Sequence, residues 1–233
     1  MARTGLVQFK STTLHKTSTA SGGTFTVDTT NNYIIDSSHG RVAGDLVSFT
    51  TDGVLPSPLV AGTIYSVLED ISTDNFTITL DGFTELDIAT SGTGTHSYDY
   101  YTTSLEIENF TVTQDAPEER GFWHESVLNG HREWITKGQH WVIEMKSNLF
   151  KESTISTRRT DFDNLFGYLY TDVYVSRFIE DSLGAVLIRD SSSVPVKFIM
   201  ESFETSFLTQ ADYEDVVTIR LRSKDYVDMS KTV

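Results

Sequence analysis

Residues 61–80 read AGTIYSVLEDISTDNFTITL, and this stretch decides the fold class. Apolar residues alternate with polar ones on both sides of a turn signal, Asp74-Asn75: Tyr65 and Val67 precede it, and Phe76, Ile78 and Leu80 follow it. Alternation with a period of two is typical of a β-strand that buries one face. The stretch therefore predicts two short strands joined by a turn.

The same pattern extends over residues 25–100. Turn formers interrupt the apolar runs at a spacing of about 10 residues, and no helical periodicity accompanies them: Asn31-Asn32, His39-Gly40, Asp52-Gly53, Pro56-Ser57-Pro58 and Asp81-Gly82. Short strands at this spacing are typical of small antiparallel sandwiches and barrels. The sequence predicts one of these two architectures and does not choose between them.

A second region with strand patterns begins near Ser104. Residues 104–113 alternate cleanly, and residues 114–130 form a polar, partly aromatic stretch that is interpreted as a loop. Two further alternating runs, 132–136 and 140–145, flank Lys137-Gly138-Gln139, which is a hairpin signal. The sequence therefore predicts a tight turn at Gly138.

Apolar spacing changes between Thr160 and Tyr170. Phe162, Leu165, Phe166 and Leu169 stand at i, i+3, i+4 and i+7, which is the spacing of one face of a helix. Thr160 is a suitable N-cap for such a helix. This is the one helix that the sequence predicts, and its apolar stripe is expected to pack on a sheet.

The charge distribution divides the 233-residue chain. Between Phe25 and Tyr100 there are 11 acidic residues and one basic residue, a net charge of −10, while the rest carries 22 acids and 17 bases, a net charge of −5. Such a shift in composition predicts two units. At the N-terminus, Leu6–Lys10 is interpreted as a strand and Ser11–Thr24 as a linker.

Bulk composition excludes several classes of protein. There is no cysteine, which excludes disulfides, thiolate metal sites and cysteine nucleophiles. No apolar run reaches the roughly 18 residues of a membrane-spanning helix, and no signal-peptide pattern opens the chain, so synthesis in the cytosol is expected. A total net charge of −15 disfavours tight binding to nucleic acid.

Motifs that would carry chemistry are not recognised. The histidines do not form a metal-binding pair at i, i+4, although His131 and His140 are expected on facing hairpin strands, where packing or exposure is favoured over metal binding. The acidic residues from Glu69 to Asp87 lack the calcium-loop pattern, so a solvated acidic face is favoured. We therefore predict no catalytic residue, no metal, no cofactor and no enzyme activity.

One aromatic surface feature does stand out. Phe122-Trp123-His124 lies in the polar stretch beside Pro117–Arg120. Such aromatics either fold into the core or anchor a protein interface, where Trp and Phe are enriched. Together with Trp134 and Trp141, these three residues are the candidate inter-subunit contacts.

The segment from Val27 to His96 resembles a small β module that is common in virion proteins of tailed phages. The resemblance covers about a third of the chain and depends on these stretches: Val27–Asn32, His39-Gly40, Gly44–Phe49, Leu55-Pro56, Ala61–Val67, Asp74–Ile78 and Gly92–His96. It is informative about the class of protein and silent about the part of the virion.

The flanking regions are similar in pattern to tail-tube-type proteins. That resemblance implies a mainly β fold: a sandwich or half-barrel with one packed helix, formed by residues 1–24 and 101–233, with residues 25–100 as an inserted acidic β module. It also implies hexameric rings that stack, contact other tail proteins and conduct DNA without binding it specifically.

The expected function is thus that of a tail tube subunit, located in the virion tail after synthesis in the host cytoplasm. The alternatives are a distal-tail, baseplate or head–tail connector ring protein, or a glycan-binding accessory module. A β-rich hydrolase, the third class, would need a pair of carboxylates in a cleft.

Overall fold

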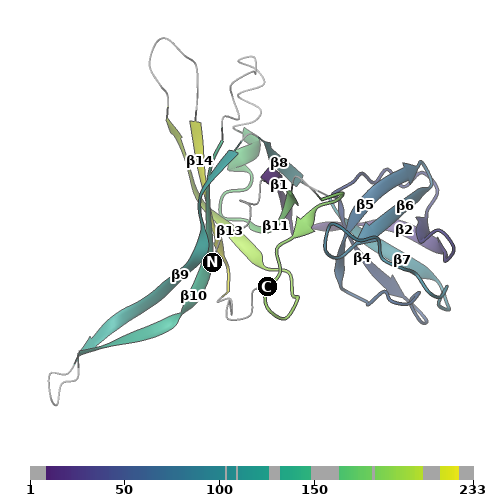
Figure 1. Ribbon diagram of the computed structural model, residues 1–233, viewed down its shortest axis with the longest axis horizontal. Helices are drawn as coiled ribbons and strands as arrows, with labels where there is room; N and C mark the ends of the chain where they lie inside the picture. Colours follow the sequence, from purple (N-terminus) through teal and green to yellow (C-terminus); the bar gives the residue numbers. More distant parts are fainter. Residues whose placement is uncertain are drawn as a thin grey trace, which may run out of the picture. The chain divides into compact units, whose positions relative to one another are not determined.

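The computed structural model describes residues 9–102, 104–108, 110–125, 132–147, 163–179, 182–206 and 216–225. The described chain is mainly β, as predicted, and its strands are labelled in Figure 1. It divides into two compact units. The first unit comprises Met1–Glu106 and Tyr174–Ile188, and the second comprises Ile107–Val173 and Arg189–Val233.

Six strands of the first unit close into a barrel in the order β2-β3-β6-β5-β4-β7. Their bounds are β2 Thr19–Asp28, β3 Tyr33–Ile35, β4 Leu46–Thr51, β5 Ile64–Ser72, β6 Asn75–Thr79 and β7 His96–Tyr101. All pairs are antiparallel, and β2 pairs with β7 to complete the circle. Of the two architectures left open by the sequence, the barrel is therefore the one that forms.

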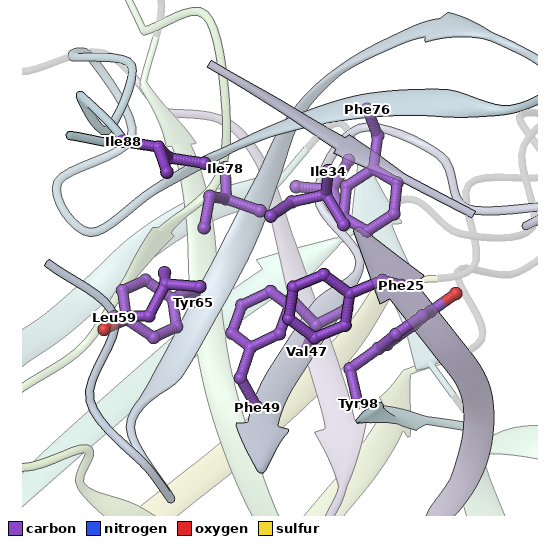
Figure 2. Close-up of a cluster of buried hydrophobic side chains, with 11 residues drawn as sticks. Phe25, Ile34, Val47, Phe49, Leu59, Tyr65, Phe76, Ile78, Ile88 and Tyr98 are labelled. Carbon is purple, nitrogen blue, oxygen red and sulfur yellow. The ribbon is translucent and has the colours of Figure 1, made fainter. Parts of the chain in front are cut away.

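Inward-facing apolar side chains fill the barrel (Figure 2). The core consists of residues that are less than a tenth exposed: Phe25, Ile34, Val47, Phe49, Leu59, Tyr65, Val67, Phe76, Ile78, Ile88 and Tyr98. Phe49 packs on Phe25 and Tyr65 with ring centroids 5.0 and 5.6 Å apart. Period-two alternation places this side of each strand inside, where burial of aromatic area is the main stabilising contribution.

Outside the barrel, the first unit contains β1 Phe9–Lys16, β12 Val186–Leu187 and most of two further strands, β8 Ser104–Glu108 and β11 Asp172–Ile179. Strand β1 is buried although it is polar: Ser11, Thr12, Thr13 and His15 are each less than a tenth exposed. The prediction of a linker over Ser11–Thr24 is therefore wrong, since that stretch lies almost entirely in β1 and β2. Ser and Thr fit a strand whose backbone is paired on both sides, and polarity alone does not make a linker.

The barrel packs against β11 and β12 within the first unit. Leu46 and Ile64 on the barrel form a buried cluster with Tyr174 and Leu187, and Tyr101 packs against it. The two rings of this cluster, Tyr101 and Tyr174, meet edge to face at 5.6 Å. The outer side of the barrel is thus partly apolar where these strands cover it.

Glycines allow the barrel and the segment of β11 and β12 to approach each other closely. The Gly184 N–H donates to the Gly82 carbonyl at 2.8 Å. A Cβ on Gly82 would lie 2.5 Å from Val186, and one on Gly44 would lie 2.7 Å from Phe178. The turns of the barrel that carry these glycines therefore approach β11, β12 and their connection closely.

The second unit contains an antiparallel sheet in the order β13-β14-β10-β9. The strands are β9 Phe110–Glu125, β10 Arg132–Ser147, β13 Lys197–Ser206 and β14 Val216–Ser223. Side chains on one face are fully buried: Ile143, Met145, Phe198, Met200, Val217, Ile219 and Leu221. The opposite face carries charged side chains, among them Glu144, Glu201, Arg220 and Arg222.

The predicted hairpin at Lys137-Gly138-Gln139 is wrong. Residues 132–147 form one continuous strand, β10, and they pair with β9, which occupies most of the predicted loop at 114–130. Thr136 pairs with Gly121 and Gly138 pairs with Arg120, so the register shifts at Lys137, which is the extra residue, and Gly138 stays within the strand. His131 lies outside the described residues, and His140 is paired in register with Glu118.

The predicted helix over residues 160–170 appears as a single helical turn, Asp163–Phe166. The Gly167 N–H donates to the Asp163 carbonyl at 3.1 Å, and the next two bonds, from Tyr168 and Leu169, already span only three residues. Thr160 and Phe162 lie outside the described residues. Within the predicted stripe, Leu165 is 1% exposed but Phe166 is 52% exposed, so the stripe is not a uniformly buried face.

Candidate functional site

A histidine and a serine lie together in the interior of the first unit. His15 Nε2 and Ser176 Oγ are 2.8 Å apart, and both residues are almost fully buried. The distance matches that of a base and the nucleophile it activates. Such a pair is the arrangement that would make a serine reactive.

The burial of this pair argues against that role. Ser176 has no exposed surface, so no substrate reaches its hydroxyl. Burial also lowers the pKa of His15 from its ordinary value of 6.5 to about 4, which makes the ring a weak base at neutral pH. The bond between His15 and Ser176 therefore serves to satisfy two buried polar groups.

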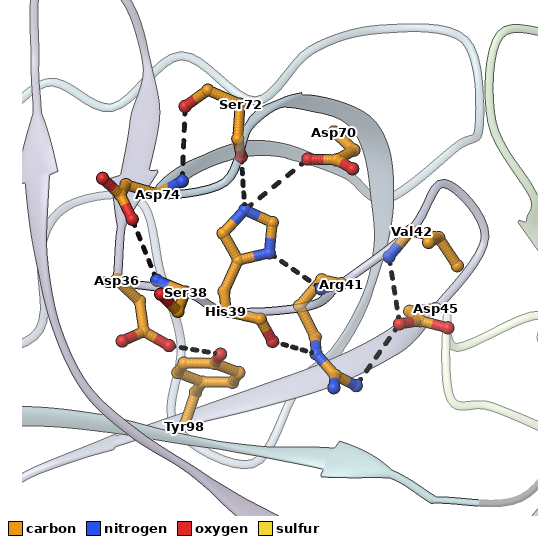
Figure 3. Close-up of polar contacts among 10 residues, drawn as sticks. All are labelled: Asp36, Ser38, His39, Arg41, Val42, Asp45, Asp70, Ser72, Asp74 and Tyr98. Carbon is orange, nitrogen blue, oxygen red and sulfur yellow. Dashed lines mark hydrogen bonds and ion pairs between the residues drawn. The ribbon is translucent and has the colours of Figure 1, made fainter.

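A second network of polar groups holds a loop of the barrel in place (Figure 3). The backbone N–H of Arg41 donates to His39 Nδ1 at 2.8 Å, so Nδ1 carries no proton. Nε2 then carries the proton and donates to the Ser72 carbonyl, also at 2.8 Å, with Asp70 Oδ1 3.6 Å away. Both ring nitrogens are occupied, and this histidine tethers the loop after β3 to the end of β5.

Arg41 is the single Lys or Arg of residues 25–100, and its guanidinium is engaged within the barrel. Its guanidinium contacts Asp45 Oδ2 at 3.3 Å and lies over the ring of Tyr100, 3.6 Å from the ring centroid. Burial raises the pKa of Asp45, while the N–H of Val42 and the charge of Arg41 oppose that rise. No cation of the barrel remains available for an anionic ligand.

His96 is held in the same way as His39. Its Nε2 donates to the Ser91 carbonyl at 3.0 Å, and its Nδ1 is 2.9 Å from the Thr51 hydroxyl. Its ring packs on Phe25 with centroids 5.5 Å apart. In the second unit, His140 Nδ1 likewise bonds to the Ser223 carbonyl at 2.8 Å. His15, His39, His96 and His140 thus have structural bonds. The sequence pattern did not assign their partners, which include Ser176 and Ser223 at distances of 161 and 83 residues along the chain.

Two hollows flank the loop that follows β3. The larger, here called the Asp36 groove, has a volume of about 670 Å³ and is lined by residues 24–27, 35–37 and 91–96. The smaller has a volume of about 490 Å³ and is lined by residues 38–40 and 70–73. Both belong to the barrel, and each contains one carboxylate, from Asp36 and Asp70 respectively.

The aromatic residues of the barrel do not gather on a surface. Phe25, Phe49, Tyr65, Phe76 and Tyr98 are in the core, as the alternation predicts. Among these core aromatics, Tyr98 also forms a polar contact: its hydroxyl donates to Asp36 Oδ2 at 2.7 Å. Burial, followed by this bond to a carboxylate, raises the pKa of Tyr98.

The predicted inter-subunit residues fall on the hairpin of β9 and β10. Backbone register pairs Trp134 with Trp123, and it pairs His124 with Glu133 and Phe122 with Ile135. Trp141 is half-buried, and its ring meets Phe198 edge to face at 6.3 Å. The structure thus brings four of the five candidates to one end of the hairpin, while Trp141 packs in the sheet of the second unit.

Charged residues form a network on the polar face of that sheet. Arg220 contacts Glu144 and Glu201, each at 3.3 Å, and Arg222 contacts Glu201 at 2.6 Å. All four side chains are about a quarter exposed. The two arginines and the two glutamates balance each other, so this network has no net formal charge.

Among the described residues, no three His, Asp or Glu side chains are grouped so that they could hold a metal ion. In the same part of the chain, no helix has the length and apolarity needed to cross a membrane.

No protein-family model matches the chain, and no curated protein matches it. Among solved structures it is similar to phage phi92 endosialidase, with 12% identity over 93% of this chain and 53% of that chain, at a TM-score of 0.25. The match therefore spans about half the length of the endosialidase. A TM-score of 0.25 does not establish a shared fold.

The prediction that the chain is not an enzyme is contradicted by this comparison, because the matched protein is itself named as an enzyme. That prediction depended on the absence of recognisable motifs, and active sites assembled from distant residues leave no such motif in a sequence. The match itself assigns no activity to this chain.

Proposed function

We propose that this chain is a structural subunit of a tailed-phage virion and that copies of it assemble through the distal part of the β9–β10 hairpin. This part, here called the arm, consists of Glu119–Glu125 and Arg132–Gln139. The length and pairing of the arm are the observations that carry the proposal.

The arm continues past the strands that support its base. Strand β14 pairs with β10 only from Val142 to Ser147, and Ser223 adds bonds to His140 and Trp141. From Gln139 to Arg132 the backbone pairing found in the described residues is with β9 alone. Figure 1 shows the two strands running together beyond the end of β14. At about 3.3 Å per residue, eight residues extend about 25 Å.

A two-stranded ribbon of this kind is stabilised when another protein surface packs on it. A hairpin of two strands is marginally stable in water and needs further strands or a packed face. The sequence supplies large apolar residues at opposite positions of this ribbon: Trp123 and Trp134, and Phe122 and Ile135. A second copy or a neighbouring tail protein that covers the arm supplies the missing burial, which supports Phe122, Trp123, His124 and Trp134 as inter-subunit contacts.

The assignment to a phage virion comes from the resemblance of residues 27–96. The stretches that carry it coincide with the barrel: Val47 and Phe49, Tyr65 and Val67, and Phe76 and Ile78 all contribute to its core. The resemblance therefore concerns a segment that folds as a closed unit. Within the virion, we favour a tail tube subunit in stacked hexameric rings, with residues 25–100 as an inserted module.

The charged face of the second unit's sheet fits a conduit for DNA. A tube lining must not retain phosphates, and arginines that are free to bind would do so. Here Arg220 and Arg222 are engaged by Glu144 and Glu201. A distal-tail, baseplate or connector ring meets the same requirement, so the position of the protein in the particle distinguishes these alternatives.

Electron microscopy of assembled particles tests the proposal. Purified protein is concentrated as wild type, as Trp123→Ser/Trp134→Ser, and as Val54→Ser/Val60→Ser, a control that changes two exposed apolar residues of the barrel. Wild type and control should form rings or tubes, and the arm variant should not. Assembly of the arm variant into rings or tubes would contradict the proposal. In whole virions, labelling of the protein at a position away from the tail axis would also contradict it.

A further inference from the structure

The Asp36 groove presents hydroxyl groups that have no role in the fold. Thr24, Thr26, Ser37, Thr93 and Thr95 line it and are exposed, and no hydrogen bond involves their side chains in the part of the chain that the structure describes. Asp36 Oδ2 accepts a hydrogen bond from the Tyr98 hydroxyl, and Asp36 Oδ1 has no hydrogen-bond partner among the described residues. The groove thus offers several hydroxyls and one carboxylate oxygen that still accepts a hydrogen bond.

The walls of the groove are fixed before any ligand arrives. Thr93 and Val54 exchange two backbone hydrogen bonds, of 2.8 and 2.9 Å, and the Thr95 N–H donates to Asp52 Oδ1 at 2.6 Å. On the other wall, the Asp36 N–H donates to the Asp74 carbonyl at 2.9 Å. Walls that are already ordered reduce the conformational entropy lost on binding.

The chemistry of the lining selects the ligand. Hydroxyl groups both donate and accept, and a carboxylate accepts, so together they complement a ligand with several hydroxyls of its own. Residues 25–100 carry a net charge of −10, and Arg41 is engaged by Asp45 and Tyr100, so an anionic ligand is repelled and finds no cation. Phe25 is only 4% exposed, so recognition depends on hydrogen bonds and not on stacking.

We propose that the Asp36 groove is a binding site for a neutral saccharide, with Asp36 Oδ1 accepting a hydrogen bond from a sugar hydroxyl. This site is separate from the arm and does not depend on assembly. Without a stacking platform the affinity of a single site is weak, at about millimolar dissociation constants. Copies held together in one particle would raise the avidity by about 10²–10⁴ when they meet a surface with many saccharides.

Ligand-observed NMR on the full chain tests the site. The probes are galactose, glucose and N-acetylglucosamine as neutral saccharides, glucuronic acid as the anionic counterpart, and a short lysine-rich peptide. The variants are Asp36→Asn and Thr93→Val. Asp70→Asn is the matched control, since it removes the same charge from the neighbouring hollow. Thermal unfolding of each variant shows whether it is folded.

At least one neutral saccharide should bind to wild type and to Asp70→Asn, and glucuronic acid should not. Asp36→Asn should weaken binding about tenfold, because a hydrogen bond to a charged group is replaced by one to a neutral amide. Thr93→Val retains the charge and should also weaken binding, which keeps the test valid if Asp36→Asn fails to fold. Absence of neutral saccharide binding, equal loss in Asp70→Asn, or binding of the peptide alone would overturn the proposal.

Discussion

At the scale of single residues, the structure differs from the sequence-based prediction mainly where polar groups are buried. The stretch from Ser11 to His15 is polar except for Leu14 and opens the segment that was interpreted as a linker, yet its side chains are buried and His15 is bonded to Ser176. The partner lies 161 residues away in the chain. Periodicity reports only neighbours along the strand, so a polar strand in the interior is invisible to it.

The buried state of His15 predicts a pH dependence of stability. In the unfolded chain the ring takes up a proton near pH 6.5, whereas burial lowers its pKa in the native state to about 4. The stabilising contribution is therefore complete above pH 6.5 and is lost as the pH falls towards 4, by about 3 kcal/mol in all. Urea unfolding of wild type and His15→Gln from pH 7 to 4 should show a shallower decline in the variant. Equal slopes would show that His15 titrates normally.

Gly22 predicts a second effect at this scale. A Cβ at this position would lie 2.1 Å from the ring of Tyr98, which is 1% exposed and cannot move away. Gly22→Ala should therefore lower the free energy of unfolding by about 3 kcal/mol. Gly62→Ala is the control: its φ of 75° is strained for alanine, but the space around it is open, so the cost should be about 1 kcal/mol. A similar melting temperature for the two variants would contradict the packing at Gly22.

At the scale of secondary-structure elements, apolar alternation predicted the strands correctly, whereas breaks in the alternation did not predict where strands end. The alternating runs on both sides of Lys137-Gly138 are strands, but the register shifts there and the chain does not turn, so the two runs are one strand. The loop and the bulge have the same local sequence signal, and pairing with β9 decides between them. The helix pattern at residues 162–169 is equally ambiguous, because four apolar residues at helical spacing do not determine how many helical turns form.

The helical turn gives a matched pair of variants. Leu165 is 1% exposed, so Leu165→Ala should cost about 2–5 kcal/mol of unfolding free energy. Phe166 is 52% exposed, and its ring meets Phe203 edge to face at 4.9 Å, so Phe166→Ala should cost only about 1 kcal/mol. Denaturant unfolding measures both. A larger cost for Phe166→Ala than for Leu165→Ala would restore the buried stripe that the sequence predicts.

At the scale of the whole molecule, the sequence predicts two units from the change in charge at residues 25–100. The structure adds what charge cannot show: the barrel is covered on one side by β11 and β12, which come from residues far along the chain. The boundaries of the inserted module stay a prediction. The Asp36 groove was not predicted either, since its lining comes from three separate segments.

Closure of the barrel predicts that residues 17–102 fold alone. The barrel core is formed by its own side chains, and a closed barrel has no strand edges that need a partner. The isolated segment should show near-ultraviolet dichroism and cooperative unfolding, and Leu46→Thr/Ile64→Thr should improve its solubility because these residues lose the cover of Tyr174 and Leu187. An unfolded segment would show that β11 and β12 are required for the barrel.

The pairing of β2 with β7 has a consequence for how this protein evolves. Thr19 and Tyr101 stand opposite each other in the ladder, so the chain enters and leaves the barrel at points about 5 Å apart. A hairpin turn in any host protein has ends at a similar separation. A single recombination event can therefore carry the coding sequence of the barrel into a turn of another gene, or remove it, without stretching the recipient.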